Sequence, residues 1–229
     1  MTVKDGPTKR ILHVLDLLLR NGPMTLAEVA RNCSFSRAAA WRALDTLRDA
    51  GWVRMRLGDN AFVILAKRST PSSERPVDFQ GASEIATHMQ ALEREYGAHI
   101  CVGAFIDGTK FTILESTDRT EYALRNISLV HEGLTLVAQA VLSKIDLVRI
   151  LRAYAQTCPL AERHMIEDGR HAAQLSDIRN QGYFLSDDHG EIAFALRLHG
   201  HMIALKIRSK TESPLAARQL IHWRNTNFP

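Results

Sequence analysis

The sequence has few cysteines and no long apolar stretch, and each absence excludes a class of protein. Its three cysteines, Cys33, Cys101 and Cys158, are widely spaced and form no CxxC pair. We therefore expect reduced thiols rather than a disulfide framework or a zinc finger. No apolar run reaches the roughly 18 residues of a transmembrane helix, and charges interrupt the first apolar stretch, which argues against a signal peptide. These features predict a cytoplasmic protein without membrane contact.

Motifs of catalysis and cofactor binding are also missing. The sequence has no G-x-S-x-G, no P-loop, and no G-x-G-x-x-G after a predicted strand. The pair His199 and His201 near Asp187 and Asp188 raises the question of a metal site, but histidines in a hairpin turn are usually exposed. We expect no enzyme activity, no cofactor and no bound metal.

Charge divides the chain into unequal parts. Residues 1–68 hold 12 of the 29 Lys/Arg and 6 of the 25 Asp/Glu, a net charge of +6, which leaves −2 for the rest. This asymmetry suggests an anionic partner for the first part, although +6 is also compatible with ordinary surface charge. The stretch "KRSTPSSERPVD" has two prolines and no apolar periodicity. We place a linker at 69–82, between domains 1–68 and 83–229.

The first domain follows the order helix, helix, turn, helix, hairpin. Apolar spacing predicts a helix over residues 8–20, and Thr25 starts a capping-box pattern for a second helix. Ser36 is a candidate N-cap for the third helix, which is expected to end at Gly51. Two short strands around the turn at 58–60 complete the pattern of a winged helix-turn-helix.

The third predicted helix has one apolar face and one basic face. The major groove of DNA is about 12 Å wide and admits one helix, and an arginine can donate two hydrogen bonds to guanine. Small side chains allow close approach to thymine methyl groups, and a helix N-terminus favours phosphate. Alternating residues of the first wing strand point to one side, where phosphates can lie. The candidate DNA-binding residues are Ser36, Arg37, Ala38, Ala39, Trp41, Arg42, Arg54 and Arg56.

Two of these residues have a second interpretation. Trp41 contacts sugar, base methyl or phosphate in one reading, and covers the edge of the core near Phe35 and Leu44 in the other. Arg42 is either a phosphate contact or a surface charge. The sequence leaves both questions open.

In the second domain, apolar patterns predict an antiparallel sheet with helices packed on it, an α+β fold. A helix is predicted at 83–97, a hairpin turning at Asp107 and Gly108, and a strand at 122–129. Two helices meet near 144–146. A further helix, three strands and a short final helix follow.

Three stretches of the sequence are similar to stretches of one known family. "TLAEVARNCSFSRAAAWRALDTLRDAGWV" matches a DNA-binding domain, and "HEGLTLVAQAVLS" and "QGYFLSDD" match a second domain. By these stretches the chain resembles the IclR family of transcriptional regulators, from about Thr8 to Ser209. The matching positions of the first stretch are Leu26, Glu28, Val29, Ala30, Arg37, Arg42, Leu44, Thr46, Leu47, Gly51 and Val53.

The resemblance implies a GAF-like effector-binding domain that takes a small metabolite, such as an organic or aromatic acid from a catabolic pathway. It also implies a homodimer or homotetramer that acts as repressor or activator. Two-fold symmetry of the protein predicts a roughly palindromic operator in double-stranded DNA.

The sequence departs from the family pattern where the effector is expected. Ala138 stands where the family has a glycine, and the loop after the paired aspartates is shortened. Lys206 and Arg208 share one face of the last strand, where a cation can hold a carboxylate, although two exposed charges on a strand edge are the commoner arrangement. The candidate effector-binding residues are Thr135, Ala138, Asp187, Asp188, Lys206 and Arg208.

The leading prediction is a sequence-specific DNA-binding regulator that responds to a small molecule. The alternative is a winged-helix protein-interaction module with a degenerate, ligand-free dimerisation domain. The salt dependence of DNA affinity separates the two, because release of counterions accompanies phosphate contacts.

Overall fold

The computed structural model describes residues 6–65, 80–106, 110–123, 127–186, 190–198, 201–209 and 217–227. The chain divides into two compact units, Met1–Ser73 and Glu74–Pro229. Most of the predicted linker lies outside the described residues, as do the turn residues Asp107 and Gly108. The last three residues of the predicted linker open a helix instead.

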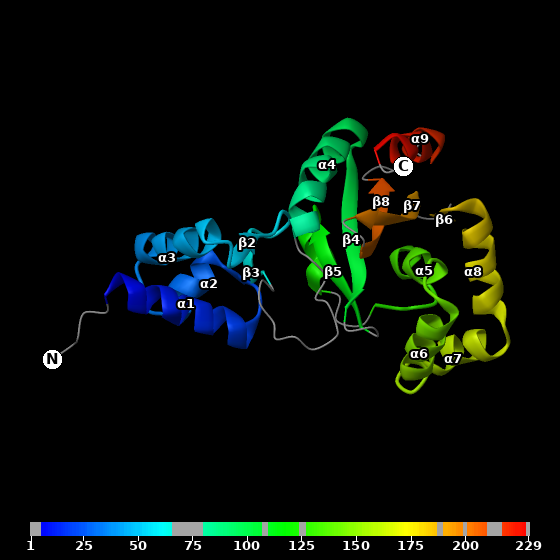
Figure 1. Ribbon diagram of the computed structural model, residues 1–229, viewed down its shortest axis with the longest axis horizontal. Coiled ribbons are helices and arrows are strands. Elements are labelled where there is room, and N and C mark those ends of the chain that lie inside the picture. The colour runs from blue at the N-terminus through cyan, green and yellow to red at the C-terminus, as the bar shows by residue number, and fades with distance from the viewer. Residues whose placement is uncertain are drawn as a thin grey trace. The chain divides into compact units, whose positions relative to one another are not determined.

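The first unit combines helices with a small antiparallel sheet (Figure 1). Its elements are α1 Pro7–Asn21, β1 Met24–Thr25, α2 Leu26–Asn32, α3 Arg37–Asp49, β2 Val53–Met55 and β3 Ala61–Ile64. The strands pair in the order β1-β3-β2. This order of elements is the one that the sequence predicts, with wing strands shorter than expected.

Side chains near the helix ends explain where α2 and α3 begin and end. Thr25 accepts a hydrogen bond from the Glu28 N–H, and the Glu28 carboxylate accepts one from the Thr25 N–H at 2.7 Å, which completes the predicted capping box. Ser36 caps α3 by accepting from the Ala39 N–H at 3.2 Å. Gly51 follows α3 with a φ of 69°, the left-handed conformation that glycine adopts without strain.

The core of the first unit lies where the three helices meet β3. Apolar side chains at helical spacing on α3 face inward, as the sequence predicts. Val14 and Val29 meet them from α1 and α2, and Phe62 closes the core from β3. The buried α3 residues are Ala39, Ala40, Ala43, Leu44 and Leu47.

The second unit is an antiparallel sheet with helices on it. Its strands pair in the order β5-β4-β8-β7-β6. The elements are α4 Gln80–Tyr96, β4 Ala98–Ile106, β5 Lys110–Ser116, the 3-10 helix η1 Arg119–Ala123, α5 Gly133–Ala140, α6 Lys144–Tyr154, α7 Leu160–Glu167, α8 Arg170–Gln181, β6 Phe184–Ser186, β7 Glu191–Leu198, β8 His201–Ser209 and α9 Ala217–Asn227.

The two faces of this sheet differ in their cover. Cys101, Lys206 and Ala193 pair across β4, β8 and β7, so their side chains share one face, which α5 covers. Ile100 and Ile207 lie on the opposite face and are fully buried. Helix α4 contacts β4 and β5, and Figure 1 shows α4 and α9 on the side of the sheet opposite α5.

One predicted strand is wrong. Residues 122–129 form no strand in their described part, because the chain enters η1 and then a turn before α5. Asp118 accepts a hydrogen bond from the Thr120 N–H, which favours a turn over an extended chain. The Tyr122 hydroxyl also bonds Glu115 and the Ser116 N–H, and thereby holds η1 against the end of β5.

The capping box of α2 gives the first testable prediction. Thr25→Ala should destabilise the first unit by about 1 kcal/mol, whereas Thr25→Ser keeps the hydroxyl and serves as the control. Hydrogen bonds from Thr25 lower the pKa of Glu28, so their contribution is present at neutral pH and is lost as the pH falls through that lowered value. Urea denaturation at pH 7 and pH 4 measures both effects, and an equal cost at the two pH values would contradict the coupling.

Candidate DNA interface and effector region

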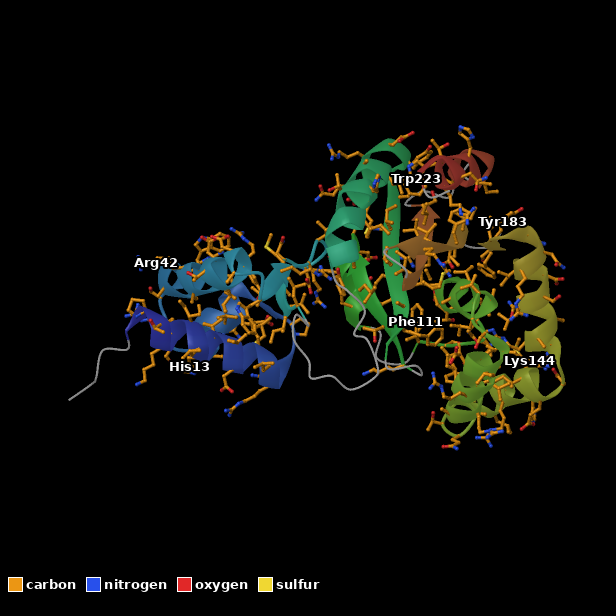
Figure 2. All side chains as sticks on the ribbon, in the orientation of Figure 1. His13, Arg42, Phe111, Lys144, Tyr183 and Trp223 are labelled. Atoms are coloured by element: carbon orange, nitrogen blue, oxygen red, sulfur yellow. The ribbon has the colours of Figure 1, made fainter. Side chains whose placement is uncertain are left out.

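Helix α3 presents an exposed basic surface beside its buried apolar face. Arg37, Ala38, Trp41 and Arg42 are exposed, and Figure 2 shows Arg42 on the outside of α3. In the part of the chain that the structure describes, neither Arg37 nor Arg42 has an ion-pair partner. Both guanidinium groups are therefore available to an external anion.

The structure bears on two of the predicted DNA contacts at the start of α3, those of Ala39 and Ser36. Ala39 is only 9 % exposed and packs toward the core, because it lies four residues before the buried Ala43 on the same face. It therefore does not present its methyl group to DNA as predicted. The Ser36 hydroxyl is exposed but already accepts the cap hydrogen bond of α3.

Trp41 covers part of the core, as one of its two predicted roles requires, and its contact with DNA stays a prediction. Its ring meets Phe62 edge to face at 6.3 Å, so it covers the core at β3. The Arg48 guanidinium lies 5.7 Å from the ring centroid. The side chain is still 39 % exposed, which leaves ring surface available for a contact with DNA.

The wing arginines do not form the predicted pair of exposed phosphate contacts. Arg54 lies on β2 and is only 8 % exposed, and Arg56 follows the strand and forms an ion pair with Asp59. Strand alternation alone does not reveal this, because it cannot show which face of a short strand is covered. Among the predicted DNA-binding arginines, the exposed ones, Arg37 and Arg42, lie on α3.

In the second unit, three of the predicted effector residues, Thr135, Ala138 and Lys206, lie in the covered layer between α5 and the sheet. The Thr135 hydroxyl donates to the Ser128 and Glu132 carbonyl oxygens, both at 2.8 Å, and Ala138 belongs to the core. Asp187 and Asp188 lie outside the described residues. None of the described candidates is exposed.

Lys206 is buried inside a group of charges, contrary to the exposed arrangement that is commoner on strands. It is 3 % exposed, and its Nζ lies 2.8 Å from Glu132 and 3.2 Å from Glu121. Arg208 pairs with Asp118 at 3.2 Å. We call Asp118, Glu121, Glu132, Glu191, Lys206 and Arg208 the Lys206 cluster.

Burial and charge act in opposite directions on Lys206. Burial lowers the pKa of its ammonium, but the carboxylates of Glu132, Glu191 and Glu121 outweigh this effect and raise the pKa above its usual value. The ammonium is thus charged and already neutralised by carboxylates of the same chain. A ligand carboxylate would have to displace one of them.

Glu191 is the first residue of β7 and is on the same sheet face as Lys206. Its carboxylate lies next to Gly133, the first residue of α5. Burial raises its pKa, Glu132 raises it further, and Lys206 opposes both effects. Its Oε1 would stand 2.6 Å from a Cβ at position 133, and the Phe184 ring would also collide with that atom. Only glycine at this position lets the carboxylate approach the helix so closely.

A cavity in the described part of this unit lies elsewhere. It has a volume of about 760 Å³ and is lined by β5, the segment before α5, the end of α6 and the start of α7. The described effector candidates Thr135, Ala138, Lys206 and Arg208 are not among its lining residues.

Sequence reasoning missed the carboxylates of the Lys206 cluster and the polar residues of this cavity, Tyr154 and Glu162. Glu121, Glu132 and Glu191 come from three separate parts of the chain, so their spacing in the sequence does not predict that they lie close together. One signal in the sequence does point to them. The lysine within the otherwise apolar strand "IALKI" indicates a buried cation, which requires acidic partners.

The described ranges hold neither a candidate metal cluster nor a helix that could span a membrane. Within them, no cluster of three or more histidine, cysteine or acidic side chains is arranged to hold a metal ion. No helix among these ranges has the length and apolar character needed to cross a membrane. The aspartates and His199 of the metal hypothesis lie outside them.

The geometry of the first unit defines a winged helix-turn-helix domain with an exposed basic recognition helix. Residues 7–56 match the model of the IclR helix-turn-helix domain family. The chain thus carries an IclR-type DNA-binding domain and is a DNA-binding transcriptional regulator, and over residues 7–56 the resemblance seen in the sequence is confirmed. No curated relative matches the chain.

The solved structures to which this chain is similar include IclR proteins of other organisms. An IclR family transcriptional regulator from Brucella abortus is 16 % identical, with 96 % of this chain and 85 % of the other covered and a TM-score of 0.44. The IclR protein of Thermotoga maritima is 15 % identical, with coverage of 96 % and 92 % and a TM-score of 0.41. An IclR homolog complexed with 4-hydroxybenzoate from Microbacterium hydrocarbonoxydans is 15 % identical, with coverage of 96 % and 95 % and a TM-score of 0.45.

Removal of the buried cation tests the Lys206 cluster. Lys206→Met leaves Glu121 and Glu132 without their main counter-charge and should destabilise the second unit by about 3–5 kcal/mol. Lys144→Met, at an exposed position of α6 labelled in Figure 2, is the control and should change stability by less than about 0.5 kcal/mol. Urea denaturation of the full chain measures both, and a loss below about 1 kcal/mol for Lys206→Met would contradict the structural role.

The raised pKa of Glu191 gives a prediction with a definite sign. A buried acid with a raised pKa binds more protons in the folded state, so stability falls as the pH rises above the unfolded pKa. Glu191→Gln mimics the protonated form and should remove this fall. The difference in stability between Glu191→Gln and the parent chain should therefore favour the variant more at pH 7 than at pH 4, and a constant difference would show that Glu191 does not titrate in this range.

Proposed function

We propose that this regulator reads a specific DNA sequence by inserting α3 into the major groove. The observation that carries the proposal is the exposed surface of α3, on which Arg37 and Arg42 have no ion-pair partner within the described part of the chain. By contrast, Arg48 near the end of the same helix pairs with Asp45. The unpaired cations lie toward the N-terminal half of α3, which also directs its free N–H groups outward.

Each exposed residue has a role that its chemistry supports. Arg37 at the first position of α3 reads a base, since its planar guanidinium can bind both acceptors of guanine. Arg42 contacts a backbone phosphate, which fixes register without reading sequence. Ala38 permits close approach to a base edge, and the exposed part of Trp41 contacts the sugar or a methyl group.

The proposal extends to a symmetric complex. Two copies of the chain related by a two-fold axis would place two α3 helices on a roughly palindromic operator, with half-sites separated by about one helical turn. The dimer or tetramer and the operator are part of the proposal, and sedimentation of the chain with and without a bound operator duplex tests them.

A small-molecule response of the second unit completes the proposal. The predicted acidic effector at Lys206 and Arg208 loses support, because both cations already pair with carboxylates of the chain. The cavity beside α6 and α7 supports binding of a small molecule without requiring an acid, since its volume of about 760 Å³ lies in the range of small-molecule sites.

The alternative, a protein-interaction module with a ligand-free dimerisation domain, makes a different prediction about salt. A DNA reader loses affinity steeply with salt, by about 0.9 in log affinity per log salt for each phosphate contact. A winged helix that binds only protein shows no specific DNA complex at all. Selection of bound fragments from sheared genomic DNA at physiological salt decides between them.

Two arginine substitutions test how α3 contacts DNA. Arg37→Ala should cost about 1–3 kcal/mol on the selected site and relax preference at one base pair, whereas Arg42→Ala should weaken all sequences alike and reduce the salt slope by about 1. Arg149→Ala, which removes one exposed positive charge from α6, is the matched control. Fluorescence anisotropy on matched and mismatched duplexes measures each effect. Unchanged base preference in Arg37→Ala would show that α3 does not enter the groove as proposed.

A further inference from the structure

The cavity of the second unit has an apolar floor. Phe111 from β5 and Ile127 and Leu129 from the segment before α5 line it, and Cys158 adds a buried thiol at the wall. Phe111, labelled in Figure 2, packs edge to face on Phe105 at 5.1 Å, so its ring is held in place. Such a floor favours a ligand with an aromatic or branched aliphatic body.

Tyr154 and Glu162 give the cavity one organised polar end. The Tyr154 hydroxyl donates to Glu162 Oε2 and accepts from the Leu129 N–H at 3.2 Å. Burial raises the pKa of Tyr154, and the hydrogen bond to Glu162 raises it further. The hydroxyl therefore stays protonated and fixes the carboxylate, whose Oε1 remains available to a donor from a ligand.

The Glu162 carboxylate forms no ion pair within the described part of the chain. Across the described ranges no ion pair joins it to Lys110, which also lines the cavity, or to another basic side chain. Its position in the first turn of α7 explains why a carboxylate is tolerated there. The apolar lining of the cavity beside α7, however, does not follow from the position of Glu162 in the helix. A half-buried carboxylate beside an apolar wall binds a positively charged donor more strongly than a neutral one.

We propose that this cavity binds a small apolar amine, with its ammonium on Glu162 and its body on Phe111, Ile127 and Leu129. The inference rests on the proposed small-molecule response and names the chemical class of the ligand. It differs from the acidic effector that the sequence suggested, because the site carries an organised carboxylate rather than an organised cation. A bound amine joins α7 to β5 and to the segment that leads into α5, and should stabilise the second unit.

Two probes of equal shape and opposite charge test the proposal. 2-Phenylethylamine and 3-phenylpropanoate share a ring and a two-carbon chain and differ in the charged group. Calorimetric titration of the full chain should show binding of the amine and none of the acid. Stronger binding of the acid, or no heat with about 5 mM amine, where even a millimolar Kd gives a signal, would overturn the proposal.

Variants of α6 and α7 locate the site. Glu162→Gln should weaken the amine at least tenfold, in line with the loss of a charge-assisted hydrogen bond. Glu167→Gln, at an exposed position of the same helix, should leave it unchanged. Ala153→Trp fills the cavity from an exposed position of α6 and should abolish binding. An amine that binds Glu162→Gln as tightly as the parent chain sits elsewhere, and that result also overturns the proposal.

The DNA affinity of the same variants separates this inference from the function it rests on. Absence of amine binding in the parent chain, when that chain still selects its operator through Arg37, rejects the amine site and leaves the regulator intact. Amine binding without any sequence-selective DNA complex rejects the DNA-reading proposal and leaves the cavity assignment standing.

Discussion

The second unit depends on the compensation of one buried charge, the ammonium of Lys206. Moving an ammonium from water into a protein interior costs several kcal/mol unless opposite charges surround it. Here those charges come from η1 through Glu121, from the start of α5 through Glu132, and from β7 through Glu191. Because the three carboxylates belong to different elements, the helical layer and the sheet are joined at one electrostatic centre. Displacement of any one element leaves a charge without a partner.

The same comparison separates paired from unpaired cations in the described ranges. Arg48 and Arg56 pair with neighbouring aspartates, and Lys206 and Arg208 pair with acids brought from other elements. Such charges are occupied and have little left to offer a partner molecule. Arg37 and Arg42 on α3 are different, because they are exposed and unpaired within the described ranges. Glu162 is an acid of the same kind. The Tyr154 hydroxyl positions its carboxylate at the cavity, and no ion pair within the described ranges neutralises it.

Much of the first unit was predictable because its signals are local. The capping box at Thr25, the cap at Ser36 and the positive φ of Gly51 each follow from a few neighbouring residues. The errors concern tertiary contacts. Burial of Ala39 at the edge of the apolar face, and of Arg54 and Lys206 on strands, depends on which face another element covers. The pairing of Tyr154 with Glu162 crosses a turn between two helices, so no periodicity in the sequence reveals it.

Position 133 has a consequence for how this chain can vary through evolution. A side chain there would collide with both Glu191 and Phe184, so position 133 shares one small volume with two residues that lie far from it in the sequence. A homologue with alanine at this position should carry a shorter residue at one of the other two, and losing Glu191 would in turn unbalance the charges around Lys206. Substitutions at these sites are therefore expected to be inherited as a set rather than singly, and their co-occurrence in aligned sequences would trace which relatives keep the same electrostatic centre.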